Sequence, residues 1–309
     1  MPMITRTDAE ALIPVEVSRE IMKNVSGGSA VLPLMKKLPN LTAKQRRIPV
    51  LASLAVAGFV TGDDGLKSVT TVNWDNVFIN AEEIAVIIPI PEAVLDDADY
   101  DIWGEVKPQI VDAFGRVIDG ALAFGTNRPT AWPEGLVPSA TAAGHVVARG
   151  TGLDIADDVG GEDGLMALVE ADGFNVNGFA GDVSIKSAFR GLRDKENGLL
   201  YQPSLQVGTP GTLYGQQINF VTNGAWDKSK ALMIGGDWSQ AVYAFRQDMT
   251  YKLLDQAVIS DAAGKIIYNL AQQDMVALRC VMRLGWALPN PINAMNPNKA
   301  TRFPFAVLK

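Results

Sequence analysis

Apolar residues recur every three or four positions over one long segment, from about Asp101 to Phe124. This spacing predicts a helix with one apolar stripe, and its main members are Trp103, Val106, Ile110, Phe114, Val117, Ala121 and Phe124. Asp99 or Asp101 can cap its start, and Gly125 is a typical residue just past a helix end. Pro108 conflicts with an unbroken helix, so we expect a kink or a later start. A helix of about 24 residues would span roughly 36 Å.

Two strand-like stretches precede this helix. Residues 50–60 are largely apolar, and residues 67–79 are rich in β-branched and aromatic side chains. Between them lies a cluster of turn-forming residues, Thr61-Gly62-Asp63-Asp64-Gly65. The pattern predicts a long β-hairpin. Because an isolated two-stranded hairpin is only marginally stable in water, we expect it to be ordered against another chain.

The rest of the chain mixes helices and strands without a regular βαβ repeat. Strands are predicted near residues 84–90, 174–179 and 276–286, short strands over 198–245, and helices near 13–25, 164–171 and 184–192. In the strand at 276–286, Arg279 and Arg283 lie on the face opposite to the apolar one, where they could bind phosphate, bind a neighbouring acid or simply be solvated. The first 45 residues otherwise read as an extended arm without a core of its own. This order of elements indicates an α+β fold.

Charge is unevenly distributed in this chain of 309 residues, whose net charge is −7. Residues 1–50 carry eight Lys or Arg against four acids, so the remainder is strongly acidic. A basic arm on an acidic body can contact nucleic acid or a neighbouring acidic subunit, and a solvated helix face is an equal alternative. The longest apolar stretch, 50–60, is too short to span a bilayer and too far from the N-terminus to be a signal peptide, so we expect cytoplasmic synthesis.

Candidate chemistry is sparse. The chain has one cysteine, Cys280, and one histidine, His145, which excludes an intrachain disulfide, a thiolate cluster and a multi-histidine metal site. No phosphate-binding glycine loop and no GxSxG motif is present. The acid pairs Asp96/Asp97 and Asp157/Asp158 are more typical of helix caps than of acid–base sites. Cys280 lies on an apolar strand face and reads as a buried, inert thiol. The sequence therefore predicts no catalytic site, no metal and no cofactor.

An ordered series of segments resembles the major capsid proteins of tailed phages of the Hong Kong 97 type. The run from Trp74 to Leu136 contains IPIPEAVLDD, similar to that family's motif before the long helix, and GTNRPTAWPEGL, similar to the loop after it. The later segments FRGLRDKENGLLYQP, TLYGQQINFV, GGDWSQAVYAFRQDMTYKLLD and FPFAVLK follow in the family's order. The resemblance covers about residues 45–309.

The resemblance implies a structural protein that self-assembles into the icosahedral head shell enclosing the double-stranded DNA of a tailed bacteriophage. It implies a Hong Kong 97-like fold with four parts: an N-arm (1–45), an extended loop hairpin (46–80), a peripheral domain with the long spine helix (81–136 and 256–309) and an axial domain (137–255). The tip of the extended loop would contact a neighbouring subunit, and its residues are Gly62, Asp63, Asp64, Gly65, Leu66 and Lys67.

The family also implies partners. Copies of the chain would form hexamers and pentamers, with a separate scaffolding protein, a portal, a decoration protein and packaged DNA bound without sequence specificity, and with no membrane. The chain would be assembled in the host bacterial cytoplasm and reside in the virion head. Some members join a loop lysine to an asparagine of a neighbour. Here Lys67 would be the lysine and Asn290, Asn293 or Asn296 the acceptor, although a solvated loop lysine is the favoured interpretation.

Two other functions stay open at this point. An encapsulin-type compartment shell, enclosing a cargo enzyme in place of a genome, shares the fold. A hydrolase using Asp96, Asp97 and His145 is the less favoured enzyme alternative.

Overall fold

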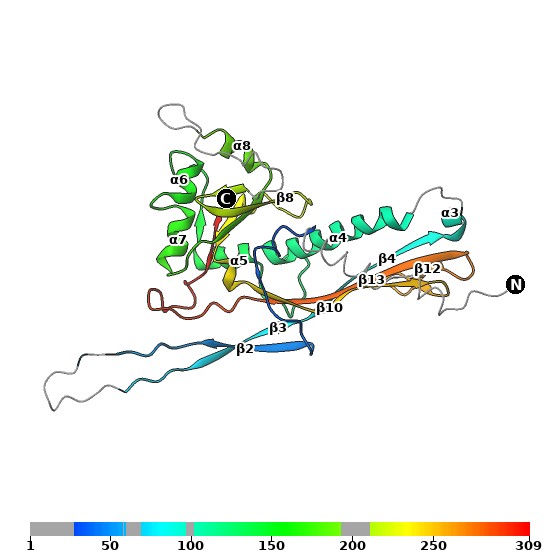
Figure 1. The fold of residues 1–309 in the computed structure, drawn as a ribbon, viewed down its shortest axis with the longest axis horizontal. Coiled ribbons are helices and arrows are strands. Elements are labelled where there is room, and N and C mark those ends of the chain that lie inside the picture. Colours follow the sequence, from blue (N-terminus) through cyan, green and yellow to red (C-terminus); the bar gives the residue numbers. More distant parts are fainter. Residues whose placement is uncertain (1–27, 58, 60–68, 97–101, 193–210) are drawn as a thin grey trace.

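The computed structural model describes residues 28–57, 59, 69–96, 102–192 and 211–309. They form an elongated molecule with two sheet-containing parts and a hairpin that projects from one end (Figure 1). The helix predicted near residues 13–25, the two predicted capping acids Asp99 and Asp101, and the tip of the predicted hairpin lie outside the described residues.

A four-stranded sheet and one long helix make the elongated part. The strand order is β1–β10–β13–β4, with bounds Lys36–Lys37, Val242–Leu254, Met275–Ala287 and Glu82–Pro91. Helix α4 (Ile102–Phe124) runs along one face of this sheet (Figure 1). Alternate residues of β13, among them Leu278, Cys280 and Met282, pack with the apolar stripe of α4 in one buried cluster. The period of two in the strand therefore meets the period of 3.6 in the helix along a shared core.

A six-stranded sheet forms the second part. Its order is β5–β14–β9–β6–β8–β7, with bounds Val146–Val147, Phe305–Leu308, Met233–Gly236, Gly178–Asp182, Gln216–Val221 and Gly211–Leu213. The accompanying helices are α5 (Leu136–Ala143), α6 (Ile155–Gly160), α7 (Leu165–Ala171), α8 (Ile185–Arg190) and the 3₁₀ turn η1 (Trp238–Gln240). A second buried cluster lies between this sheet and helices α6, α7 and α8.

Two hairpins complete the fold. The projecting hairpin pairs β2 (Gln45–Leu51) with β3 (Trp74–Asn80), and a smaller one pairs β11 (Val258–Ser260) with β12 (Ile266–Asn269). They lie at opposite ends of the molecule, and the short helix α3 (Glu92–Asp96) lies near the smaller one (Figure 1).

The predicted long helix and hairpin are confirmed. Gly125 ends α4 with φ +67°, and its N–H donates to the carbonyl of Ala121 at 3.1 Å. The later start that Pro108 suggested is wrong, because α4 begins at Ile102 and includes this proline in its second turn. As the seventh residue of the helix, Pro108 removes the one hydrogen bond that an N–H there would donate to the Gly104 carbonyl, and the helix continues past it.

Three boundaries differ from the sequence prediction. The loop expected after Gly125 contains helix α5, which buries Leu136, Val137 and Ala140. The first strand of the hairpin, β2, ends at Leu51, although the apolar stretch continues to residue 60. The strand expected at 174–179 begins only at Gly178. In each case, burial against a neighbouring element decides where the regular structure begins and ends.

Residues 28–41, called the strap below, lie across α4 and beside β10. Val31, Leu32 and Met35 enter the core beside α4. The backbone at Gly28 passes so close to the helix that a Cβ on Gly115 would lie 2.4 Å from the carbonyl oxygen of Gly28. The expectation that this segment would have no core of its own is confirmed for the strap, because it is completed by the elements beneath it.

One buried carboxylate fixes the strap to the helix. Asp119 of α4 is 1% exposed and accepts hydrogen bonds from Ser29 Oγ (2.5 Å), the N–H groups of Ala30 (3.0 Å) and Val31 (3.3 Å), and Asn223 Nδ2 (2.8 Å). Burial raises the pKa of Asp119, and the four hydrogen bonds partly offset that rise. The carboxylate therefore joins the strap, α4 and the turn after β8.

We predict that Asp119→Ala lowers the free energy of unfolding by about 2–4 kcal/mol, because several buried donors lose their acceptor. Since the pKa is raised in the folded chain, the folded state binds more protons, and the advantage of wild type over the variant should grow as pH falls toward the unfolded value. Denaturant unfolding of the unassembled chain at two pH values measures both effects. Asp112→Ala, at an exposed position of the same helix, is the control, and an equal loss there would contradict the role of Asp119.

Candidate subunit contact surfaces

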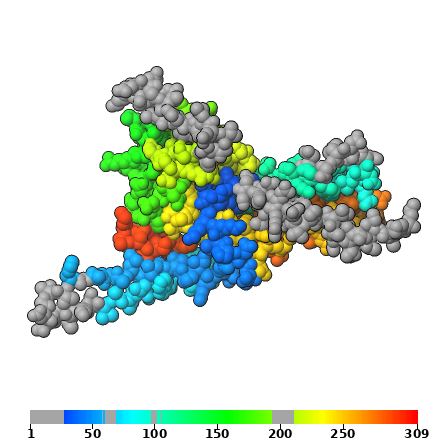
Figure 2. Space-filling view, viewed as in Figure 1, coloured from blue at the N-terminus to red at the C-terminus, as the bar shows by residue number. Residues whose placement is uncertain are grey.

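The outer face of the projecting hairpin is apolar and open. Cross-strand register pairs Leu51 with Trp74 and Arg47 with Phe78 on this face. Trp74 is 67% exposed and Phe78 is 44% exposed. Beyond the paired strands, the exposed apolar side chains continue, with Val56, Phe59, Val69 and Val72. Exposed apolar side chains gathered on a segment that stands away from the body (Figure 2) are typical of a surface that contacts another protein.

The inner face of the same hairpin is anchored to its own body. Ile79 is fully buried in a cluster with Leu41, Ala244 and Ala287. β3 crosses β13 at Gly285, where a Cβ would lie 2.5 Å from the carbonyl oxygen of Asn80, so only glycine permits this approach.

Side-chain hydrogen bonds lock the same crossing. Trp132 Nε1 donates to the Asn80 carbonyl at 3.0 Å, and Asn80 Nδ2 donates to the Ala131 carbonyl at 2.9 Å. On the projecting part, Lys299 Nζ lies 3.0 Å from Asp75 Oδ2. The base of the hairpin is thus rigidly held while its outer face is left uncovered.

A second apolar surface lies at the opposite end of the molecule. In β11 and β12, Val258 and Ile266 are more than half exposed, and Ile267 and Tyr268 are also exposed. Consecutive residues of a strand point to opposite faces, so Ile266 and Ile267 leave both faces of this hairpin apolar. The sequence contains a pattern typical of this hairpin, because the turn Asp261-Ala-Ala-Gly264 separates two β-branched runs, although no hairpin was predicted here.

The sheet face opposite α4 carries an uncompensated pair of cations. Lys252 and Arg279 are direct cross-strand partners, and both are exposed. Two like charges in this position destabilise a strand pair. Arg283, four residues along β13, differs because it forms an ion pair with Glu83 of β4 (2.5 and 2.8 Å). Of the two arginines singled out in the sequence, Arg283 has an acid partner on its own sheet, and Arg279 has no ion pair among the described residues.

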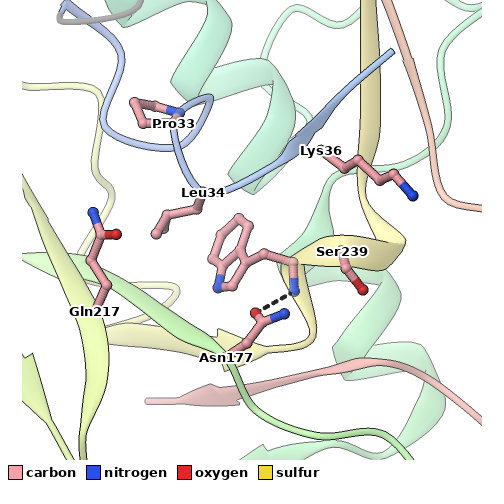
Figure 3. A pocket seen from close by; sticks show the side chains of 7 residues that line it. Pro33, Leu34, Lys36, Asn177, Gln217 and Ser239 are labelled. Atoms are coloured by element: carbon pink, nitrogen blue, oxygen red, sulfur yellow. Dashed lines mark hydrogen bonds between the residues drawn. The ribbon is translucent and has the colours of Figure 1, made fainter.

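A cavity of about 440 Å³ lies where the strap meets the six-stranded sheet (Figure 3). It is lined by Pro33, Leu34, Lys36, Asn177, Gln217, Trp238 and Ser239. The Asn177 Oδ1 accepts the backbone N–H of Trp238 at 2.9 Å, and Trp238 Nε1 donates to the Gly178 carbonyl at 2.9 Å. These polar groups already bind one another, so the residues that line the cavity are better suited to holding the strap against the sheet than to catalysis.

The predicted loop-tip residues, Gly62 to Lys67, lie outside the described residues, so their contacts stay a prediction. The three predicted crosslink acceptors are engaged within their own chain, Asn296 through Nδ2, which donates to Asp172 Oδ1 at 2.7 Å. Asn290 Nδ2 donates to the Arg302 carbonyl at 2.8 Å, and Asn293 Nδ2 donates to the Asp172 carbonyl at 2.6 Å.

The residues considered for catalysis are dispersed. Asp96 ends α3, and Asp97 lies outside the described residues. The Asp157 and Asp158 carboxylates lie in the first turn of α6 and accept backbone N–H groups of the preceding loop, from Leu153, Gly150 and Gly152, whereas the residue that caps α6 is Asp154. Among the described residues, no group of three or more His, Cys, Asp or Glu side chains could hold a metal ion, and no described helix could cross a membrane. His145 is buried beside Asp172, a pairing that the sequence did not indicate.

Cys280 is fully buried, and burial raises the pKa of its thiol to about 12. We predict that a disulfide reagent at about pH 8 modifies the folded chain roughly a thousandfold or more slowly than the denatured chain, because the thiolate is the reactive form. Spectrophotometric release of the reagent's thiol measures this. A Thr212→Cys variant adds an exposed thiol on β7 and should react rapidly, whereas rapid reaction of the wild-type chain would contradict the assignment.

Comparison with known proteins gives consistent matches. The family model described as the phage capsid family matches residues 9–296. The major capsid protein of Staphylococcus phage 80alpha is 24% identical over 274 residues, covering 87% of this chain and 79% of that protein. A solved structure from Microbacterium phage Oxtober96 has a TM-score of 0.79 at 36% identity and covers 99% of both chains. One from Mycobacterium phage Cain has a TM-score of 0.75 at 32% identity, covering 91% of this chain and 90% of that one. These matches confirm the predicted α+β class.

Proposed function

Because the chain belongs to the phage capsid family, we propose that it is the major capsid protein of a tailed phage, which self-assembles into the icosahedral head shell around double-stranded DNA. The observation that carries this proposal is the projecting hairpin, whose base is anchored and whose outer face exposes Trp74 and Phe78, uncovered by the part of the chain that the structure describes. Such a face is completed when a second copy lies against it, as in obligate interfaces.

The parts of the molecule take their expected roles within this proposal. The fold is of the Hong Kong 97 type, with β2 and β3 as the extended loop, α4 as the spine helix of a peripheral domain, and residues 137–255 as the core of an axial domain. The sheets cross the expected boundaries: β10 (Val242–Leu254) pairs with β13, and β14 (Phe305–Leu308) pairs with β9. This interleaving couples the two domains within each subunit.

The proposed partners are further copies of the chain in hexamers and pentamers, a separate scaffolding protein, a portal, a decoration protein and packaged DNA. The proposed location is the virion head after assembly in the host cytoplasm. An enzymatic role receives no support, because the candidate acids are dispersed and the carboxylates of Asp157 and Asp158 bind backbone N–H groups. The compartment-shell alternative would use the same surfaces, but the relatives named above come from phages.

Electron microscopy of the purified, expressed chain tests the function. Closed shells or capsomers are expected. A monodisperse monomer whose β2 and β3 amides resist hydrogen exchange at high dilution would contradict the proposal, because the hairpin would then be stable without a second copy. Nucleic acid, or instead an enzyme, inside particles from the native source separates the phage shell from the compartment.

We predict that the double substitution Trp74→Glu and Phe78→Glu prevents shell formation while leaving the fold intact. Both side chains are exposed in the single chain, so the variant should keep its unfolding midpoint, yet each interface copy would lose roughly 2 kcal/mol or more. Size-exclusion chromatography and circular dichroism measure the two properties. Asp75→Asn, which changes the charge at an exposed position on the opposite face of the same hairpin, should still assemble. Normal shells from the double variant would refute this contact surface.

For Lys67 we propose the solvated state over the intersubunit crosslink. Asn290 and Asn293 already use their amide groups on Arg302 and Asp172, which supports this choice. We predict that boiled shells run as monomers in denaturing gel electrophoresis. A ladder of covalent multimers that disappears in a Lys67→Arg variant would establish the crosslink instead.

A further inference from the structure

The single histidine of the chain sits in a buried polar network at the C-terminal strand. His145 is 6% exposed and follows α5 directly after Gly144. Its Nε2 lies 3.1 Å from Asp172 Oδ2, at the end of α7. Its Nδ1 lies 3.1 Å from the carbonyl oxygen of Phe305 in β14. Each ring nitrogen therefore faces an oxygen that can only accept.

A neutral imidazole carries one N–H and can serve only one of these acceptors. The other nitrogen would then point a lone pair at an oxygen lone pair across 3.1 Å without solvent to intervene. We infer that His145 is held as the doubly protonated imidazolium, which clamps Asp172 and the C-terminal strand together, and that loss of this proton releases the strand. This inference is independent of the proposed shell function.

The groups around the ring agree with a cation there. Asp172 also accepts from the Phe303 N–H at 2.7 Å and Asn296 Nδ2 at 2.7 Å, so no described contact requires it to carry a proton. The ring of Phe303 packs edge-on against the imidazole.

Arg302 is the other buried charged group near this network, and its guanidinium binds the oxygens of Asn290 and Asn296. Burial lowers the pKa of Arg302, and Asp172 partly offsets this, but a guanidinium remains charged in proteins. Among the described residues, the charged groups facing His145 are thus Asp172 directly and Arg302 on the far side of that carboxylate.

The proton controls one particular contact. A ring with a single proton would keep Nε2–H on the carboxylate, the stronger acceptor, and lose the hydrogen bond to Phe305. The N–H of Val307 donates to the His145 carbonyl at 3.0 Å, so the strand is tied at two points to this residue. The clamp is complete while both ring nitrogens carry a proton, so residues 303–308 are the segment that loosens when one proton is removed.

Magic-angle-spinning ¹⁵N NMR of the full-length chain, labelled at histidine, tests the charge directly, since one residue gives the whole signal. Two protonated ring nitrogens at neutral pH are expected. One protonated and one bare nitrogen would overturn the inference. Asp172→Asn removes the counter-charge and should give the neutral spectrum. Asp158→Asn, at a buried aspartate that binds only backbone N–H groups, is the matched control and should leave the imidazolium signal unchanged.

Hydrogen exchange tests the release. The protection of the amides of residues 303 and 305–308 should fall roughly tenfold when the ring loses its proton, the effect of one hydrogen bond. In His145→Gln, whose amide cannot donate to both acceptors, protection should be low at neutral pH and should lack the step with pH. A step that persists in this variant, after correction for intrinsic exchange, would show that another group controls the strand.

Discussion

Strand β13 is the constraint on which the rest of the structure depends. It hydrogen-bonds to β10 on one side and to β4 on the other over most of its length. Its Leu278, Cys280 and Met282 face α4, and at Gly285 its other face receives the projecting hairpin. The thirteen consecutive residues of β13 therefore fix the positions of β10, β4, α4 and the projecting hairpin relative to one another. The alternation of side chains in an extended strand is what allows one segment to serve both faces.

Where a periodic pattern met a single burial requirement, the sequence predicted the structure well. The stripe along α4 and the alternation in β13 were both read correctly, because each element buries one face against one neighbour. The hairpin could also be predicted, since a turn-forming cluster separated two β-rich runs. The expectation that it has no partner within its own chain was wrong for its base, because Ile79 is buried against Leu41, Ala244 and Ala287.

What could not be predicted depended on contacts distant in sequence. Helix α5 is short, and only its burial against the core distinguishes it from the loop expected there. The Ser29–Asp119 contact joins residues 90 positions apart, and a single acid within an apolar stripe does not say which donors reach it. His145 looked like a loop residue because Asp172 and Phe305 are brought to it by two different elements. The Lys252–Arg279 pair needed the register of β10 against β13.

The crossing at Gly285 has a consequence for geometry on a larger scale. In a closed shell built from copies of one chain, the angle between neighbouring subunits has to differ from place to place. In this protein the base of the projecting hairpin is fixed to the four-stranded sheet by a backbone contact at Gly285 that tolerates no side chain. The hydrogen bonds of Trp132 and Asn80 hold the same crossing. A contact this close opposes any change of the angle between the hairpin and the sheet at the hairpin's base.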